Sequence, residues 1–258
     1  MVARESGVGM KNLAVLGYPI SHSKSPTIML AALNHLGVEA RFDVIELSGG
    51  LANWLSSPAN MYESLSVTIP LKPEACAVAM SLDAASKATG STNCLIRSEG
   101  GYRGFNTDGF GLVNAVKEHE FKTVGVLGTG ATARTALYSF QDYETLVWGR
   151  DDVKAAELAK NFGAVSLGFD EVIAADLVIS TLPIGVLPSM IAGRSGKVLL
   201  DIAYTNPSSS KFAVEISGIE MLIWQAIGQL RQLLNDGHEL ADEQVLHDLM
   251  LRAVMMEE

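Results

Sequence analysis

Metal-binding and disulfide patterns are nearly absent from this sequence. The 258 residues include only two cysteines, Cys76 and Cys94, and these form no CxxC pair. No histidine cluster lies near them, so neither a catalytic nor a structural zinc site is predicted. We expect both cysteines to be buried, reduced thiols and expect no metal in the protein.

Long apolar runs and an excess of positive charge are also missing. No run approaches the roughly 20 apolar residues of a membrane-spanning helix, and the N-terminal stretch reaches only a short apolar strand. The 29 acidic and 19 basic side chains give a net charge of -10, which would repel nucleic acid or an anionic membrane. We therefore expect a soluble, cytoplasmic protein that binds small molecules. The sequence leaves its oligomeric state open between a monomer and a homodimer.

What the sequence does contain is an alternation of short apolar runs with longer amphipathic stretches, which is typical of an α/β layer fold. One series starts at residue 12. A connecting helix is predicted over 106–120, and a second series of the same kind follows. Apolar residues at three- and four-residue spacing over 220–234 and 241–255 predict helices at the end of the chain.

The first predicted helix has clear boundaries in the sequence. It covers residues 26–36, with Ser25 as N-cap, Pro26 at its first position and Gly37 after its end. These positions follow from the conformational preferences of the three residue types at helix ends.

A lysine between two prolines, in "SVTIPLKPE" at residues 66–74, stands where an alternating strand pattern stops. A strand that reaches Pro70 cannot continue its ladder, and Lys72 precedes Pro73, which disfavours helical backbone angles at the lysine. The pattern therefore predicts that Lys72 lies on a stiff corner after a strand. Such corners often hold functional groups, although a solvated lysine is a common loop residue.

The sharpest local motif is "VGVLGTGATA" at residues 124–133, an apolar strand followed by a glycine-rich turn and a possible helix. Gly128 permits the tight turn, Gly130 lets the backbone approach a pyrophosphate, and the small Ala133 lets the helix pack close to the strand. The phosphates would meet backbone amides at the helix N-terminus. The motif predicts a dinucleotide-binding Rossmann unit.

The end of the next strand bears on the choice of cofactor. An NAD site usually places an acidic residue there for the ribose hydroxyls, but Gly149 occupies that place and Arg150 follows it. An arginine can hold a 2′-phosphate through its planar guanidinium. The pattern favours NADP over NAD, although Asp151 and Asp152 come next and Arg150 taken alone would be read as a solvated arginine.

Reduction of a carbonyl by a nicotinamide also needs a group that supplies a proton to the oxygen. None of the six tyrosines has a lysine four residues later, so the Tyr-x-x-x-Lys pattern of short-chain dehydrogenases is absent. Lys72 is the leading candidate. Asp108, in "GFNTDGFG", could orient and compensate its ammonium, although an aspartate taken alone is more often the N-cap of a helix than a catalytic group.

Seven motifs together resemble the shikimate dehydrogenase family. They extend from about Leu13 to Gln225 in the family's order and approximate spacing, and they read "GYPISHSKSP", "SVTIPLK", "GSTNCL", "GFNTD", "GTGATA", "DIAYTNP" and "MLIWQA". No single one is unique to the family, but seven in register are hard to obtain by chance.

The resemblance implies a two-domain α/β architecture. A substrate domain, residues 10–108 and 225–258, would face a doubly wound Rossmann domain, residues 109–224, with the C-terminal helices returning to the first domain. The implied activity is reversible, NADPH-dependent reduction of 3-dehydroshikimate to shikimate in aromatic amino acid biosynthesis. We expect the cleft between the domains to close on ligands.

The resemblance also implies roles for individual residues. Lys72 and Asp108 would be the catalytic pair. Ser23 and Ser25 would bind the substrate carboxylate. The ring and its hydroxyls would meet Thr68, Asn93, Tyr204 and Gln225, in addition to the catalytic pair. Each of these side chains also has an ordinary structural interpretation, such as a helix cap, a strand residue or a packed aromatic. The cofactor would meet Gly128, Thr129, Gly130, Ala131, Thr132, Gly149, Arg150, Ser180, Thr181 and Leu182.

This chain departs from the family pattern on the cofactor side. It has Gly130-Ala131 where the family commonly has two glycines, Gly149-Arg150-Asp151 where the family has Asn-Arg-Thr, and "STLPIG", residues 180–185, in place of Asn-Ala-Thr-Ser. Two alternatives therefore stay open: an NAD-preferring quinate/shikimate dehydrogenase, and a non-catalytic nucleotide-binding module with the same fold.

Overall fold

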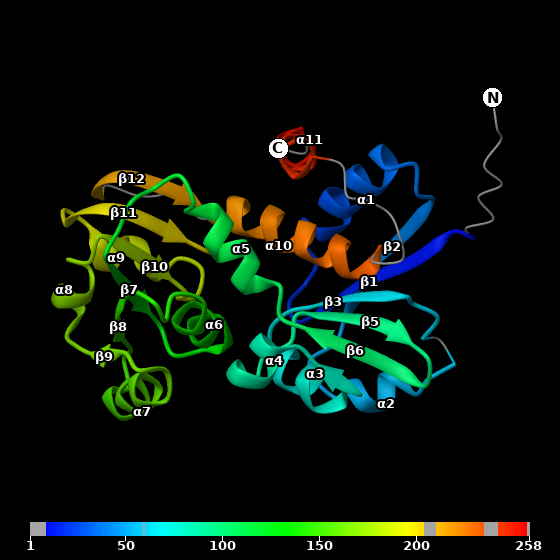
Figure 1. Cartoon of the computed structure of the whole chain (residues 1–258), viewed down its shortest axis with the longest axis horizontal. Coiled ribbons are helices and arrows are strands. Elements are labelled where there is room, and N and C mark those ends of the chain that lie inside the picture. The colour runs from blue at the N-terminus through cyan, green and yellow to red at the C-terminus, as the bar shows by residue number, and fades with distance from the viewer. Residues whose placement is uncertain (1–8, 59, 204–209, 235–241, 257–258) are drawn as a thin grey trace.

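The computed structural model describes residues 9–58, 60–203, 210–234 and 242–256, arranged as two lobes that each contain one sheet (Figure 1). Each sheet has six strands. Helices lie beside both sheets, which confirms the α/β fold expected from the alternation of apolar and amphipathic segments.

The first sheet mixes parallel and antiparallel pairs in the order β2-β1-β3-β5-β6-β4. β1 is parallel to both β2 and β3, whereas β5 is antiparallel to β3 and to β6. Its strands are β1 (Lys11–Gly17), β2 (Ala40–Glu46), β3 (Ser64–Val67), β4 (Ser81–Leu82), β5 (Cys94–Ser98) and β6 (Gly101–Phe105). The helices of this segment are α1 (Ser25–His35), α2 (Leu51–Leu55), α3 (Lys72–Val78) and α4 (Ala84–Thr89).

The second sheet is parallel throughout and has the order β12-β11-β10-β7-β8-β9. Its strands are β7 (Thr123–Leu127), β8 (Glu144–Trp148), β9 (Val165–Ser166), β10 (Leu177–Ser180), β11 (Ser195–Asp201) and β12 (Lys211–Ser217). The helices between them are α6 (Ala131–Ser139), α7 (Asp152–Phe162), α8 (Phe169–Val172) and α9 (Leu187–Ile191). This is the strand order of a dinucleotide-binding sheet, with its topological switch point between β7 and β10.

Two helices connect the lobes. α5 (Asp108–Ala115) leaves the first sheet, and α10 (Gly218–Leu233) leaves β12 and runs back to the first lobe (Figure 1). α11 (Glu243–Met255) then packs with α10 and α1. Leu13 of β1 shares one apolar core with residues of these three helices, so the predicted helical end of the chain and its return to the first lobe are confirmed.

The predicted domain limits relate to these connecting helices. Residue 108 is the first residue of α5, whereas the limit between residues 224 and 225 falls inside the continuous helix α10. The division of the chain into two domains at these residues stays a prediction.

A polar contact joins α10 to α11. His247 of α11 is buried, stacks on Trp224 of α10 with ring centroids 5.0 Å apart, and places Nε2 2.7 Å from Glu220 Oε2. Its Nδ1 lies 3.2 Å from Asp248 Oδ1. The contact fixes the position of α11 on the helix that also carries Gln225.

Two local predictions were wrong at helix starts. Ser25 is the first residue of α1 rather than its N-cap, and its backbone amide donates to Ser23 Oγ at 3.3 Å. Pro26 is therefore at the second helical position, where the missing N–H is equally harmless. Gly37 follows the helix with φ +70°, in agreement with the sequence.

Lys72 was expected on a non-helical corner after a strand reaching Pro70. The strand β3 ends earlier, at Val67, and Lys72 is the first residue of α3, with Pro73 behind it. A proline is accepted in the first turn of a helix, where its missing N–H has no intrahelical acceptor to lose. Here the helix start outweighs the local preference of a residue that precedes proline.

Candidate active site

Lys72 and Asp108 form an ion pair between the first residues of α3 and α5. Lys72 Nζ donates to Asp108 Oδ2, and their side chains are only 12% and 5% exposed. The pairing of Lys72 with Asp108, which the spacing of the two residues in the sequence could not establish, is therefore present. Asp108 does not cap α5, because both of its carboxylate oxygens accept hydrogen bonds from other side chains.

Asn93, just before β5, holds the other oxygen of this carboxylate. Its Nδ2 donates to Asp108 Oδ1 at 2.8 Å, and also lies 2.9 Å from Thr107 Oγ1 and 3.1 Å from Gln225 Oε1. Its Oδ1 accepts from the Thr107 backbone amide at 2.7 Å. Both the nitrogen and the oxygen of the Asn93 amide are therefore hydrogen-bonded, which fixes the position of the Asp108 carboxylate.

Gln225 reaches this cluster from α10 because α5 and α10 cross closely. A Cβ placed on Gly111 would lie 2.6 Å from the Met221 carbonyl oxygen and 2.9 Å from Gln225 Cβ, so only glycine allows this approach. Gln225 Nε2 donates to the Leu222 carbonyl at 2.8 Å, and its Oε1 faces Asn93. Residues from α3, α5, α10 and the segment before β5 therefore meet at one place.

Thr68, Ser23 and Ser25 follow the carboxyl ends of the neighbouring parallel strands β3 and β1. The two segments are in contact, since the Tyr18 amide donates to the Ile69 carbonyl at 2.9 Å. Within the described part of the chain, no hydrogen bond joins the three hydroxyls to Lys72 or Asp108. Tyr204, the remaining predicted substrate residue, lies outside the described residues.

The glycine-rich turn lies between β7 and α6, at the switch point of the second sheet. Gly128 has φ +116°, and a Cβ there would lie 2.3 Å from Thr181 Oγ1, so both conformation and space require glycine. Thr181 is held in place because its hydroxyl donates to the Leu127 carbonyl at 2.9 Å. The residue that follows β10 therefore packs directly against the turn and holds it in place.

Gly130 differs from Gly128, because a Cβ built on it would meet no protein atom within 4 Å. It stands at the N-cap of α6, which has no side-chain cap, and the first amides of a helix lack intrahelical acceptors. The half-buried Ala131 and Thr132 supply two of these amides. Open space in front of uncapped amides fits a phosphate group.

At the end of β8, Gly149 stands where an NAD site has an acidic residue. A Cβ on Gly149 would lie 2.5 Å from Thr129 Cγ2, so a larger residue at position 149 would require the Thr129 side chain to move. Arg150 is exposed and has no ion-pair partner among the described residues. Its guanidinium is available for a phosphate at this edge of the sheet.

Two other predicted cofactor residues are buried at the end of β10. Ser180 is fully buried, and its Oγ finds no hydrogen-bond partner within the described residues. Leu182 packs in an apolar core with Leu127 and Leu187. Both residues lie at the carboxyl end of β10, next to β7 and the switch point of the sheet.

Sequence reasoning missed several residues that organise the site. Asn106 donates through Nδ2 to Thr135 Oγ1 of α6 at 2.9 Å and to Thr89 Oγ1 of α4 at 3.1 Å, so it contacts both lobes. Arg134 Nε also donates across to the Thr89 carbonyl at 2.6 Å. Asn106 was inside the motif "GFNTD", but nothing in the motif shows that its partners come from two lobes.

The pair Ser66 and Gln229 was also missed. Gln229 Nε2 donates to Gln225 Oε1 at 2.7 Å, and Ser66 Oγ donates to Gln229 Oε1 at 2.6 Å. Gln229 lies four residues after Gln225 on α10, so helical spacing could have placed it on the same face. Its contact with Ser66 spans 163 residues, which no local pattern predicts.

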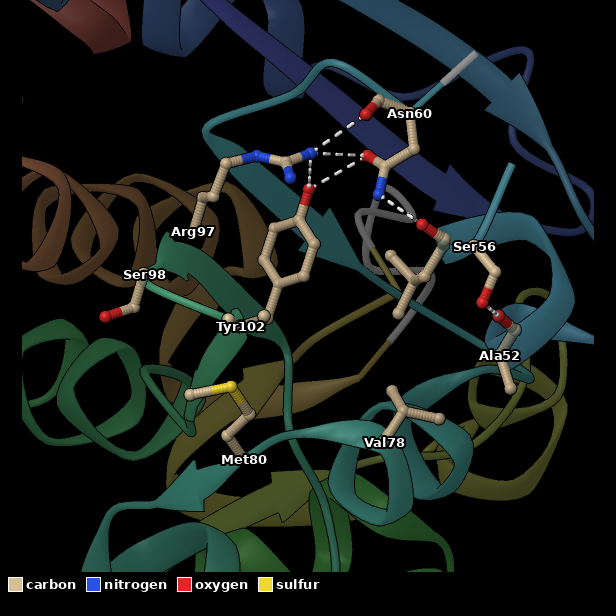
Figure 2. Close-up of a pocket in the computed structure, with 11 residues that line it drawn as sticks. Ala52, Ser56, Asn60, Val78, Met80, Arg97, Ser98 and Tyr102 are labelled. Carbon is tan, nitrogen blue, oxygen red and sulfur yellow. Dashed lines mark hydrogen bonds between the residues drawn. The ribbon is translucent and has the colours of Figure 1, made fainter. Parts of the chain in front are cut away.

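A hollow of about 550 Å³ lies elsewhere, between α2, the end of α3 and the β5–β6 hairpin (Figure 2). Arg97 donates there to Asn60 and to the Tyr102 hydroxyl, so its guanidinium is occupied by protein partners. None of the Lys72 cluster lines this hollow. It is separate from the candidate site.

The two cysteines are free thiols in different environments. Cys94 is buried and burial raises the pKa of its thiol, whereas Cys76 is only half-buried, so the expected burial holds fully for one of the two free thiols. No group of three acidic, cysteine or histidine side chains that could hold a metal ion occurs among the described residues. In those residues there is also no helix with the length and apolar character needed to cross a membrane.

Comparisons with known proteins point to one family. Residues 15–95 match the shikimate dehydrogenase substrate binding domain. A shikimate dehydrogenase (NADP(+)) from an Exiguobacterium species is 30% identical over 232 residues, which cover 83% of this chain and 89% of that protein.

The crystal structure of shikimate 5-dehydrogenase from Thermus thermophilus, in complex with NADP(H) and shikimate, matches with TM-score 0.83 and 26% identity over 95% of this chain and 100% of that one. Shikimate dehydrogenase from Mycobacterium tuberculosis matches with TM-score 0.82 and 27% identity over 94% of this chain and 99% of that chain.

Proposed function

This chain belongs to the shikimate dehydrogenase family, and we propose that it catalyses the reversible, NADPH-dependent reduction of 3-dehydroshikimate to shikimate in aromatic amino acid biosynthesis. The observation that carries this function is the buried Lys72–Asp108 pair, enclosed by Asn93 and Gln225 in the lobe that faces the dinucleotide-type sheet. A proton donor and a nucleotide site are the two parts that such a reaction needs.

Lys72 is the residue we assign to proton transfer. Its Nζ carries only donors and is held at one position by Asp108 Oδ2, so it can give a proton to the carbonyl oxygen as that oxygen gains charge. Asp108 orients the ammonium and compensates its burial. Because the Lys72 side chain is 12% exposed, a proton can return to Nζ from solvent. In the reverse direction, Nζ accepts the proton from the hydroxyl.

Substrate binding is assigned to the polar groups around this pair. Ser23 and Ser25 would donate to the carboxylate, and Thr68, Asn93, Gln225 and Tyr204 would meet the ring and its hydroxyls. The support for the first three is their position at the ends of β1 and β3 next to α3, with hydroxyls that make no bond to the catalytic pair. A small acid with several hydroxyl groups needs donors of these kinds.

The turn between β7 and α6 would hold NADPH, which would supply the hydride when bound. The turn fits such a cofactor, because the uncapped α6 amides and the open space at Gly130 would receive the pyrophosphate. Arg150 would hold the 2′-phosphate, and Gly149, packed against Thr129, leaves no carboxylate to repel it. The relatives named above as NADP(+) enzymes or bound to NADP(H) agree with this choice.

The remaining expectations are part of the same proposal. Residues 10–108 and 225–258 would act as the substrate domain and 109–224 as the cofactor domain, with the contacts of Asn106 and Arg134 between the lobes yielding when the cleft closes. The protein would work in the cytoplasm as a monomer or homodimer, without a nucleic-acid partner.

The test is a steady-state assay of NADPH or NADH formation with purified protein, using shikimate or quinate together with NADP⁺ or NAD⁺. The expected result is the highest kcat/KM for shikimate with NADP⁺. A higher kcat/KM for quinate with NAD⁺ would replace the proposal with the alternative quinate/shikimate dehydrogenase. Absence of turnover in all four combinations, with NADPH still bound, would indicate the non-catalytic nucleotide-binding module.

A further inference from the structure

The hydrogen-bond network around Asp108 continues past Gln225 to a buried pair on the far side. Gln229 is 2% exposed and Ser66 is 7% exposed, and they join α10 to the centre of the first sheet. Ser66 is bonded to Gln229 at 2.6 Å, and Gln229 is bonded in turn to Gln225 at 2.7 Å. Neither has a role in the chemistry described above.

The orientation of the three side-chain amides in the network, Asn93, Gln225 and Gln229, is fixed by their partners. The Thr107 backbone amide can only donate, so Asn93 presents Oδ1 to it and Nδ2 to the acceptor-only carboxylate of Asp108. The Leu222 carbonyl can only accept, so it selects Gln225 Nε2. Gln225 Oε1 must therefore face Asn93 and Gln229, and Gln229 must present its Nε2.

This direction determines what Gln225 has left for a ligand. Its Oε1 accepts from Gln229 Nε2 at 2.7 Å and lies 3.1 Å from Asn93 Nδ2, whose two hydrogens are shared among three acceptors, so both lone-pair directions of the amide oxygen face amide donors. Its Nε2 donates one of its two hydrogens to the Leu222 carbonyl, so one N–H remains for a ligand. Gln225 can meet a substrate hydroxyl only as a donor.

We propose that Gln229, held by Ser66, is a positioning residue that fixes Gln225 as a hydrogen-bond donor to a substrate hydroxyl. The inference rests on the proposed function, because it takes the ring of shikimate as the ligand. Gln229 touches neither substrate nor cofactor and acts through the oxygen of Gln225. Ser66 acts one step further away, through the oxygen of Gln229.

The first test compares Gln229→Leu with Gln232→Leu, the same change on the same helix at a residue outside the network. Loss of the Gln229 bond frees the Gln225 amide to turn, so we expect KM for shikimate to rise about tenfold with kcat nearly unchanged, the pattern of lost uniform binding. KM for NADP⁺ should stay at the wild-type value. The Gln232→Leu enzyme should match wild type in all three constants.

Gln229→Glu provides a readout that a purely structural role would not change. The ionised carboxylate of this variant can accept from Ser66 but places an acceptor against Gln225 Oε1, whereas the protonated carboxyl can donate to that oxygen. Burial holds the pKa of such a carboxyl above its usual range. The ratio of KM for shikimate between Gln229→Glu and wild type should therefore be several-fold lower at about pH 6 than at about pH 9.

Ser66→Ala completes the test as a double-mutant cycle. Alone it should raise KM for shikimate about threefold, and added to Gln229→Leu it should change nothing further, because Ser66 acts only through Gln229. Additive effects, a pH-independent ratio for Gln229→Glu, or a wild-type KM in Gln229→Leu would each overturn the proposal. If Gln229→Leu does not fold, the other two variants decide. A wild-type enzyme without shikimate turnover would instead contradict the proposed function.

Discussion

Lys72, Asp108, Asn93 and Gln225 make their hydrogen bonds with one another, whereas Gly130 and Arg150 on the other lobe face open space or solvent. The first group is assembled from side chains on separate helices and a loop, and most of its donors and acceptors are already paired. The second group offers a helix N-terminus and one exposed cation. The substrate side is therefore arranged before a ligand binds, and the cofactor side presents unpaired groups to one.

This difference predicts different sensitivities on the two sides. A change inside the paired cluster leaves a buried partner unsatisfied, which is costly, and it also moves the groups that touch the reacting atoms. A change at the exposed cofactor side removes one contact and leaves the rest in place. The three predictions below test this contrast in order of expected size.

Lys72→Ala should have the largest effect, because it removes the proton donor and leaves the Asp108 carboxylate buried without its cation. We expect kcat for shikimate oxidation to fall by roughly 10²- to 10⁴-fold, while the dissociation constant for NADPH, measured by its fluorescence, stays near wild type. Lys87→Ala, an exposed lysine on α4, is the matched control and should keep full activity. An unchanged kcat in Lys72→Ala would remove Lys72 from the mechanism and erase the contrast between the two sides.

The contrast also explains what could be predicted from the sequence. The turn at Gly128 and Gly130 is a local motif, in which strand, glycines and helix follow one another within ten residues, so its position could be read directly. The contact between Lys72 and Asp108 was expected from the chemistry of the reaction together with the family resemblance. Its geometry was not, because Lys72 begins a helix instead of standing on a corner.

The rest of the substrate side depends on contacts between distant segments. Asn93 meets Gln225 across 132 residues and Ser66 meets Gln229 across 163, on a helix, α10, whose close approach to α5 requires glycine at position 111. Nothing in the local pattern around a glycine, serine or glutamine encodes such a crossing. Asn106, which contacts both lobes, lay inside a recognised motif, yet its partners Thr89 and Thr135 are on two helices far apart in the chain.

Arg150→Ala should have an intermediate effect, confined to one cofactor. Loss of a charge-assisted contact to the 2′-phosphate is expected to raise KM for NADP⁺ roughly tenfold while KM for NAD⁺, kcat and KM for shikimate remain unchanged. Lys154→Ala is the matched control, since Lys154 is a neighbouring exposed cation that pairs with Asp151 instead. Equal increases in KM for both cofactors would show that Arg150 does not recognise the phosphate.

The smallest effect should come from His247 of α11, which contacts Glu220 and Trp224 of α10. Burial favours the neutral imidazole, but hydrogen bonds to the Glu220 and Asp248 carboxylates outweigh it and raise the pKa of His247 above 6.5. Gln244 is also in contact with the ring, and the Lys117 ammonium lies 4.0 Å from the centre of the Trp224 ring on which His247 stacks. Since the folded-state pKa exceeds the unfolded one, the stabilisation is complete below about pH 6.5 and is lost as pH rises through the raised pKa.

His247→Gln should therefore lower the free energy of unfolding, measured in urea, by on the order of 1 kcal/mol at about pH 6 and by less at about pH 9. His35→Gln, an exposed histidine at the end of α1, is the control and should show no such trend. The charge-assisted bond between His247 and Glu220 exists only while the imidazole is protonated. The loss of stability caused by His247→Gln should therefore shrink as the pH rises. A loss that is the same at both pH values would mean that the charge on His247 does not contribute to stability, and that its stacking on Trp224 accounts for the effect of this residue.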